Sequence, residues 1–326
     1  MLPPVMALII SALVTAASLP VSRIISKRFG LEGVDIHKPE KPKIPKIGGL
    51  SLFTGITAGA SAGLVLSGLY RDALALSLAL TISAAIGLAE DFRELNPILK
   101  PFLVALAGLP IIMLGTYSPY PELPFIGKAR LTILYPLLVL VGTAIVANAV
   151  NSIDVLNGSM ALTSIASLSP LLSIGILYSK PDVVIISASM LASLAVFASQ
   201  NFFPAKIFSG NVGSLSVGTA FAALAVIGGV EVVVLIALMP QIMNELHIIL
   251  SMGGLRNAKN VVLRPVEVNG YSIKASVVRG APITLVRLLT SLEPLTEKRV
   301  VYLLAYLCLY SGFLAFLTYA LFMGGR

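Results

Sequence analysis

Long apolar segments alternate with short polar ones along almost the whole chain. A helix that spans a bilayer needs about 20 mostly apolar residues. Ten segments come close to this length: 3–22, 48–69, 72–89, 99–117, 131–150, 159–178, 182–201, 213–229, 231–251 and 300–323. The pattern predicts an all-α integral membrane protein with about ten transmembrane helices, forming a single polytopic domain over 1–326.

Composition supports this interpretation. Of the 326 residues, 57% are hydrophobic and only 12% are charged, whereas a typical soluble domain has about 25% charged residues. The mean hydropathy is +0.94. The first apolar segment follows no basic stretch and is long enough to span, so we expect a membrane helix there and not a cleaved signal. The single cysteine, Cys308, excludes a disulfide within the chain.

The distribution of basic residues predicts the orientation in the membrane. An even number of helices places both termini on one side, and the loops then divide into two sets. One set holds most of the 23 Lys and Arg residues, in a basic strap at 23–47 and in a large loop at 252–299 before the last helix. Because Lys and Arg collect in cytoplasmic loops, we expect the strap and the large loop in the cytoplasm and both termini on the extracytoplasmic side.

The polar motifs all fall on the predicted cytoplasmic side, and the outer loops are short. A channel or a transporter needs functional polar groups near the bilayer midplane. The distribution therefore favours chemistry at one face of the membrane over transport, although a transporter or flippase of polyprenyl-linked lipids stays an alternative.

Two motifs carry acids. "GLAEDFRELNPILK" at 87–100 places Glu90 and Asp91 at the end of one apolar segment and Lys100 at the start of the next. Paired carboxylates at such a place suit a divalent cation or a general base, but a solvated helix end also carries acids.

The motif "ANAVNSIDVLNGS" at 147–159 is more specific. Asn148, Asn151 and Asp154 recur every third residue, so they drift by only about 60° per step around a helix. Asn157 and Gly158 then indicate the turn that ends it. Amide and carboxylate oxygens are ligands for a hard cation, and hydrogen bonding between helices is the alternative explanation.

Two further motifs suggest phosphate binding. "AKIFSGNVGSLSVG" at 205–218 puts Gly210 and Ser214 at the start of a helix, where backbone N–H groups favour anions; small residues also serve close helix packing. The strap motif "GVDIHKPEKPKIPKIGG" at 33–49 carries Lys38 and Lys46. They suit either an anionic substrate or anionic lipid headgroups.

Taken together, these motifs resemble the polyprenyl-phosphate N-acetylhexosamine-1-phosphate transferases. The acidic motif stands where that family has an Asp-Asp pair followed by Lys, "NAVNSIDVLNG" where it has an Asn-rich segment, and "SGNVGS" where it has "GDxGS". The resemblance covers nearly the whole chain. It implies a ten-helix membrane enzyme that moves a sugar 1-phosphate from a UDP-sugar to a polyprenyl phosphate and releases UMP with Mg²⁺, or alternatively Mn²⁺.

Other segments resemble the dolichyl-phosphate GlcNAc-1-phosphate transferase branch, in an archaeal-type form: "GVDIHK" at 33–38, "PQIMN" at 240–244 and 283–304. The loop 252–299 contains no histidine, unlike that of the bacterial cell-wall transferases. The branch implies UDP-N-acetylhexosamine and dolichyl-type phosphate as substrates, and the first step of lipid-linked glycan assembly for protein N-glycosylation. It leaves a homodimer open and implies no nucleic acid partner.

The resemblance also suggests roles for individual residues. Asp91, Glu90, Asp154 and Lys100 are expected to be catalytic, and Asn157, Asn211 and Asp154 to hold the metal. The expected substrate-binding residues are Lys38, Lys46, Asn148, Asn151, Gly210, Ser214, Arg256 and Arg264, with Lys259 as a further candidate.

Two positions depart from the family pattern. Glu90 stands for an Asp, and Asn211 stands for the Asp that binds the metal in the family. Asn211 leaves a catalytically weak or inactive member as an alternative, one that binds lipid phosphate or nucleotide-sugar. Asp154 is a candidate to supply the missing negative charge.

Overall fold

The computed structural model describes residues 2–256 and 263–324. Within these residues, eight helices are long and apolar enough to cross a membrane. They are α1 (Leu2–Arg28), α2 (Gly49–Leu66), α3 (Tyr70–Phe92), α6 (Tyr135–Ser152), α7 (Ser159–Leu177), α8 (Pro181–Asn201), α9 (Gly210–Ile227) and α13 (Glu297–Phe322). Eight of the ten predicted segments are therefore single long helices, and the all-α membrane fold is confirmed.

The other two predicted segments are interrupted. The segment 99–117 forms α4 (Leu99–Ala105), the short 3₁₀ helix η1 (Leu106–Gly108) and α5 (Leu109–Met113). The segment 231–251 forms α10 (Glu231–Ala237) and α11 (Met239–Ser251), bent by 68°. Pro240 in the first turn of α11 lacks the N–H that a continuous helix would use. Two serine hydroxyls donate hydrogen bonds to backbone carbonyl oxygens at the break: Ser311 to Ile236 at 2.5 Å and Ser167 to Ala237 at 3.0 Å.

The few strands are short, and all lie in the polar connections. The strap folds into the hairpin β1 (Glu32–Val34) and β2 (Lys43–Pro45), and the connection before α6 contains β3 (Glu122–Leu123) and β4 (Gly127–Lys128). The large loop contains β5 (Val266–Asn269), β6 (Ser272–Ala275), α12 (Leu285–Leu289) and β7 (Leu295–Thr296), with β6 paired antiparallel to both β5 and β7.

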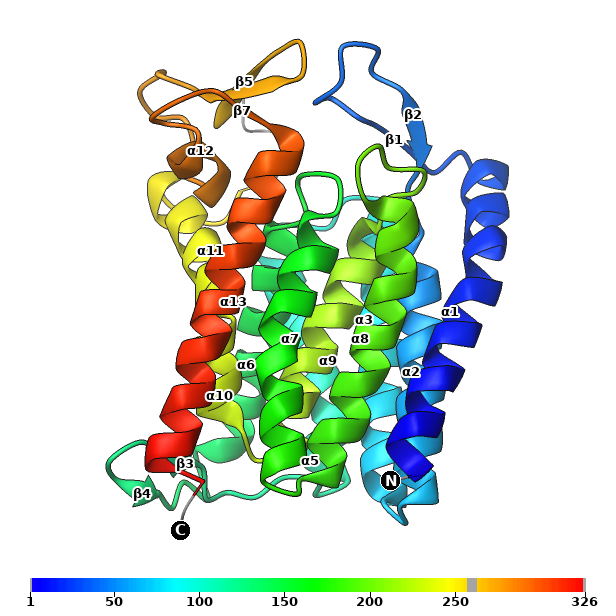
Figure 1. The fold of residues 1–326 in the computed structure, drawn as a ribbon, viewed down its shortest axis with the longest axis vertical. Coiled ribbons are helices and arrows are strands. Elements are labelled where there is room, and N and C mark those ends of the chain that lie inside the picture. The colour runs from blue at the N-terminus through cyan, green and yellow to red at the C-terminus, as the bar shows by residue number, and fades with distance from the viewer. Residues whose placement is uncertain (1, 257–262, 325–326) are drawn as a thin grey trace.

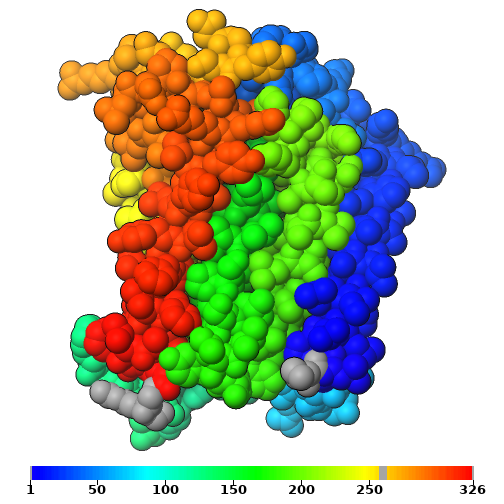
Figure 2. Space-filling model, viewed as in Figure 1, coloured from blue at the N-terminus to red at the C-terminus, as the bar shows by residue number. Residues whose placement is uncertain are grey.

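The two ends of the helical bundle differ. Both termini lie at one end (Figure 1), whereas the strap hairpin and the β5–β7 segment lie together at the other. The space-filling view shows these two polar segments forming a cap over that end of the helices (Figure 2). A hydrogen bond of 2.9 Å from the Tyr271 hydroxyl to Glu40 joins them. The cap covers the end at which the sequence placed the polar motifs.

Helix α9 is the centre of the bundle, and every residue from Val212 to Val226 is buried. Small residues let neighbouring backbones approach its first turns. A Cβ added at Gly49 of α2 would lie 2.0 Å from the Gly213 Cα, and one added at Gly87 of α3 would lie 2.6 Å from the Asn211 carbonyl oxygen. Only glycine allows such close contact. This packing brings the ends of α2, α3 and α6 next to the first residue of α9.

Candidate active site

The N-terminus of α9 is held by the carboxylate of Asp91, which lies near the end of α3. Asp91 accepts hydrogen bonds from the Asn211 backbone N–H at 3.0 Å, the Asn211 side-chain amide at 3.0 Å and the Val212 backbone N–H at 3.1 Å. The Lys46 ammonium lies 3.0 Å from the same carboxylate. A helix begins with unpaired N–H groups and a partial positive charge, so a buried carboxylate is stable there.

Gly210 makes this approach possible. Its φ is +64°, and an added Cβ would lie 2.6 Å from Asp91 Oδ2. A side chain at this position would therefore be strained and would push against the carboxylate. The glycine at this position of the motif is explained by the contact that it allows.

Lys100, at the start of α4, joins three residues on the other side of Asn211. Its ammonium lies 2.9 Å from Glu90 Oε2, 3.0 Å from Asn151 Oδ1 and 3.5 Å from Asn211 Oδ1. The Asn151 amide in turn donates to Asn211 Oδ1 at 3.0 Å and to the Ser214 hydroxyl at 2.7 Å. We call this group the Asp91 cluster; its members are Lys46, Glu90, Asp91, Lys100, Asn151, Asn211 and Ser214.

Asp154 lies beside the Asp91 cluster, in the turn that follows α6. It accepts a hydrogen bond from the hydroxyl of Ser209, two residues before Asn211. The pKa of Asp154 is raised to about 7: burial is the largest cause, the Ser209 hydrogen bond acts in the opposite direction, and the negative charge of Asp91 adds to the rise. Asp154 therefore lies close enough to Asp91 for the two carboxylates to interact electrostatically.

This raised pKa predicts a pH dependence of stability. The pKa in the folded protein is about 7, against 3.8 for an ordinary aspartate, so between these values the folded state holds a proton that the unfolded state releases. The contribution of Asp154 to stability is therefore largest below pH 4, falls as the pH rises from about 4 to about 7, and is constant above. Relative to an Asp154→Asn variant, the wild-type protein should lose about 3–5 kcal/mol over this range. Unfolding in detergent with EDTA at several pH values measures it; parallel curves for the two proteins would contradict the assignment.

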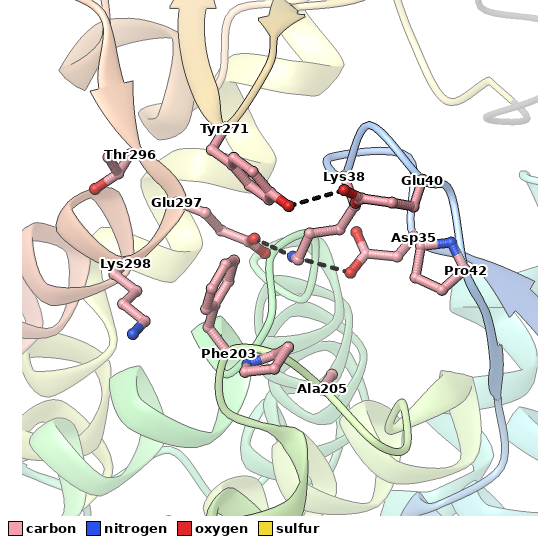
Figure 3. Close-up of a pocket in the computed structure, with 11 residues that line it drawn as sticks. Asp35, Lys38, Glu40, Pro42, Phe203, Ala205, Tyr271, Thr296, Glu297 and Lys298 are labelled. Atoms are coloured by element: carbon pink, nitrogen blue, oxygen red, sulfur yellow. Dashed lines mark hydrogen bonds and ion pairs between the residues drawn. The ribbon is translucent and has the colours of Figure 1, made fainter.

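A second buried group lies under the strap, and we call it the Lys38 cluster: Asp35, Lys38, Asn157 and Glu297. Figure 3 shows Asp35, Lys38 and Glu297 of this cluster. The Lys38 ammonium lies 3.0 Å from Asp35 and 2.5 Å from Glu297, and 4.0 Å from the centre of the Phe203 ring. Asn157 donates its side-chain amide to Asp35 at 2.9 Å and its backbone N–H to Glu297 at 2.7 Å. The cluster borders a cavity of about 540 Å³ lined by residues of the strap, the 203–205 segment, Tyr271 and the start of α13.

The structure thus separates residues that the sequence placed in one site. Lys46, Glu90, Asp91, Lys100, Asn151, Gly210, Asn211 and Ser214 lie together. Lys38 is only 5% exposed and bound to two carboxylates, so it is not presented to a substrate phosphate in this structure. Asn157 belongs to the Lys38 cluster.

The remaining predicted residues are members of neither cluster. Asn148 donates to the Ala144 carbonyl of its own helix at 2.8 Å. Arg256 and Arg264 are exposed. Burial lowers the pKa of His37; the charge of Asp35 raises it, and the charges of Lys38 and Arg264 lower it, so Arg264 lies near the strap. Lys259 lies outside the described residues.

Sequence reasoning missed three residues that make these contacts: Asp35, Ser209 and Glu297. Asp35 stands three residues before Lys38, a spacing at which an acid and a base commonly meet. Ser209 directly precedes the Gly210 that was singled out. Glu297 begins α13 and lies 259 residues from Lys38, so no local signal links the two.

The side chains near Asn211 include carboxylate and amide oxygens, the ligand types that a hard divalent cation prefers. Among the described residues, no group of three or more His, Cys, Asp or Glu side chains is placed to share an ion. However, Asp154 and Asp91 lie close enough to interact, and a cation relieves repulsion between carboxylates. Carboxylate and amide oxygens, completed by water, are the ligands that Mg²⁺ uses.

Comparison with known proteins identifies the family of the chain. Residues 73–229 match glycosyl transferase family 4. Over 224 residues, covering 67% of this chain and 69% of the relative, the chain is 30% identical to a Saccharolobus solfataricus protein named as a UDP-N-acetylglucosamine–dolichyl-phosphate N-acetylglucosaminephosphotransferase. A Sulfolobus acidocaldarius protein of the same name is 31% identical over 215 residues, covering 63% of this chain and 65% of the relative.

The chain matches a bacterial relative to a similar extent. The chain is 31% identical over 233 residues to a Bacillus subtilis protein named as an undecaprenyl-phosphate N-acetylglucosaminyl 1-phosphate transferase, with 69% of this chain and 63% of the relative covered. The matched segment 73–229 contains the two acids of the Asp91 cluster, Glu90 and Asp91, and the first turns of α9. The chain therefore belongs to glycosyl transferase family 4, as its motifs indicate.

Proposed function

We propose that this membrane protein transfers N-acetylglucosamine 1-phosphate from UDP-N-acetylglucosamine to a polyprenyl phosphate of the dolichyl type, releasing UMP. This reaction would be the first step of lipid-linked glycan assembly for protein N-glycosylation. The names of the archaeal and bacterial relatives support it. The observation that carries it is the Asp91 cluster: two lysines, two carboxylates and two amides gathered at one end of an apolar helical bundle.

The position of the cluster suits a substrate with a lipid tail and a phosphate head. The tail would stay in the bilayer, and the phosphate would reach the end of the bundle from between the helices. We place this end on the cytoplasmic face, where the Lys and Arg residues of the strap and the large loop collect and where the nucleotide sugar is available.

The reaction needs charge and position more than a base. An oxygen of the lipid phosphate attacks the β-phosphorus of the donor, a new P–O bond forms, and the bond to the UMP oxygen breaks. A phosphate monoester is largely ionised near neutral pH. Lys46 and Lys100 are the cations of the cluster, and they would hold and neutralise the phosphates. Asp91, whose side chain is completely buried, would position the N-terminus of α9 and Lys46.

We further propose that the site uses Mg²⁺, with Mn²⁺ as an alternative. Asp154 and Asn211 would hold it, whereas the side chain of Asn157, which the sequence suggested as a further ligand, donates its amide to Asp35 in the Lys38 cluster. The ion would supply positive charge to the diphosphate as UMP leaves. Asp154 is the one carboxylate of this set, so it would replace the charge that Asn211 lacks.

Substitution of Asp154 tests this replacement. In Asp154→Asn, the Mg²⁺ concentration for half-maximal activity is expected to rise by about 10-fold, since Mg²⁺ prefers a carboxylate to an amide. Glu293→Gln, an exposed acid 59% accessible to solvent, is the control and should not change it. An Asp154→Asn enzyme with the wild-type Mg²⁺ dependence would remove Asp154 from the metal site.

The function itself is tested by incubating purified protein with labelled UDP-N-acetylglucosamine, dolichyl phosphate and Mg²⁺. We expect UMP and a lipid-linked sugar diphosphate in equal amounts. Neither product, across several UDP-sugars and polyprenyl phosphates, would overturn the proposal.

One observation favours a second candidate, a non-catalytic family member. The Asn211 side-chain oxygen that would bind the metal accepts hydrogen bonds from Lys100 and Asn151. It is the oxygen of a neutral amide and not of a carboxylate. Such a protein would bind the lipid phosphate or the nucleotide sugar without transfer. Activity that appears only in Asn211→Asp would establish this alternative.

A further inference from the structure

The Lys38 cluster joins three segments that are far apart in the sequence. Asp35 and Lys38 belong to the strap, Asn157 belongs to the turn after α6, and Glu297 is the first residue of α13. Figure 3 shows the Glu297 carboxylate facing the Lys38 ammonium, with Asp35 on the other side of it. All four residues are at most 5% exposed. Ionised groups are rarely buried unless each finds partners, and here each does.

The contacts to Asn157 fix both its backbone and its side chain. Glu297 accepts from the backbone N–H, and Asp35 accepts from the side-chain amide. The next backbone N–H, that of Gly158, donates to the Asn201 side chain at 3.1 Å. Hydrogen bonds to a carboxylate are about twice as strong as those between neutral groups. The turn 153–158 is therefore attached to the strap, to α8 and to α13.

The charges in the cluster do not balance, which distinguishes the two contacts of Glu297. Asp35 and Glu297 carry two negative charges, and Lys38 carries one positive charge. Lys38 and Asp35 would form a neutral pair without Glu297, so the second carboxylate is not needed to compensate the lysine. Its other contact is the backbone N–H of Asn157.

We propose that Glu297 is a positioning residue of the transferase site. It acts through the Asn157 backbone N–H, which it holds so that the turn carrying Asp154 keeps its place beside the Asp91 cluster. The inference rests on the proposed function in one respect, the role of Asp154 at the site. The contact between α13 and the turn can be tested without it.

Two substitutions separate the two contacts of Glu297. Gln in Glu297→Gln keeps an oxygen that accepts from the Asn157 N–H and loses the charge that faces Lys38. Leu in Glu297→Leu has a similar size and loses both contacts. Glu293→Gln, four residues earlier and exposed, is the matched control.

The first measurement is hydrogen–deuterium exchange of the full-length protein in detergent, followed in peptides that cover 150–160. We expect exchange of the turn amides to be about 10-fold faster in Glu297→Leu, within about 3-fold of wild type in Glu297→Gln, and unchanged in the control. Wild-type exchange in Glu297→Leu would overturn the proposal. If Glu297→Leu does not fold, the Glu297→Gln variant decides alone. Exchange of its turn amides as fast as in an unfolded peptide would overturn the proposal, because only the ion pair with Lys38 would then matter.

The second measurement links the turn to the reaction. Glu297→Leu should lower kcat by about 30-fold and raise the Mg²⁺ concentration that the enzyme requires, with the KM for lipid phosphate unchanged. Glu297→Gln should keep kcat and the Mg²⁺ requirement close to those of the wild type. Loss of kcat to the same extent in both variants would contradict a role through the backbone of Asn157. An inactive wild-type protein would refute the proposed function, whereas the exchange experiment would still decide on the contact.

Discussion

Replacement of Asp91 by alanine is expected to lower the transferase rate by at least about 100-fold and the free energy of unfolding by about 3–5 kcal/mol. The carboxylate is fully buried and accepts three hydrogen bonds from the first turn of α9, besides its contact with Lys46. Its removal leaves these donors and the helix N-terminus without a partner. The shift of Asn211 and Lys46 then misplaces the groups that hold the phosphates.

Activity assays and unfolding in detergent measure the two effects. Asp72→Asn is the matched control, because Asp72 lies in the first turn of the same helix at the opposite end of the bundle. It should leave the rate unchanged. An Asp91→Ala protein with wild-type stability and activity would show that α9 does not depend on this carboxylate.

Replacement of Lys38 by methionine is expected to lower the free energy of unfolding by about 3–5 kcal/mol, because it leaves Asp35 and Glu297 buried without a positive charge between them. The loss should shrink at low pH, where one of the two carboxylates takes up a proton. The double variant Lys38→Met with Glu297→Gln should recover part of the stability, since it removes one of the uncompensated charges.

Denaturation of the two single variants and the double variant, as a double-mutant cycle, measures the coupling. Lys298→Met is the control: Lys298 also faces the Phe203 ring, at 5.0 Å, but it is exposed. Equal losses for Lys38→Met and Lys298→Met would contradict the buried ion pair.

The apolar pattern predicted where helices form better than how they end. The spacing of Asn148, Asn151 and Asp154 predicted one stripe on a continuing helix. That expectation was wrong at its last member, because α6 ends at Ser152 and Asp154 lies in the following turn. Asn148 bonds to its own helix, so Asn151 alone brings this helix into the Asp91 cluster. Helix periodicity describes directions only while the helix continues.

The members of the Asp91 cluster were predictable because each stands at the end of an apolar segment. Ends on the same side of a bundle meet wherever the helices pack closely. The Lys38 cluster was not predictable in this way. Its lysine looked like a phosphate ligand because one of the two acids that it contacts comes from the start of the last helix. Pairing across that separation depends on tertiary packing, which the sequence pattern does not report.

The bend between α10 and α11 has a consequence for the large loop. It directs α11 so that Asn244 meets the end of α6 and donates its side-chain amide to the Ser152 hydroxyl at 3.0 Å. The Asn244 side-chain oxygen accepts a hydrogen bond from the backbone N–H of Leu285 at 2.8 Å. At the other end of the loop, Glu297 fastens the start of α13. The segment from Leu285 to Glu297 is thus attached to the helical bundle at both of its ends.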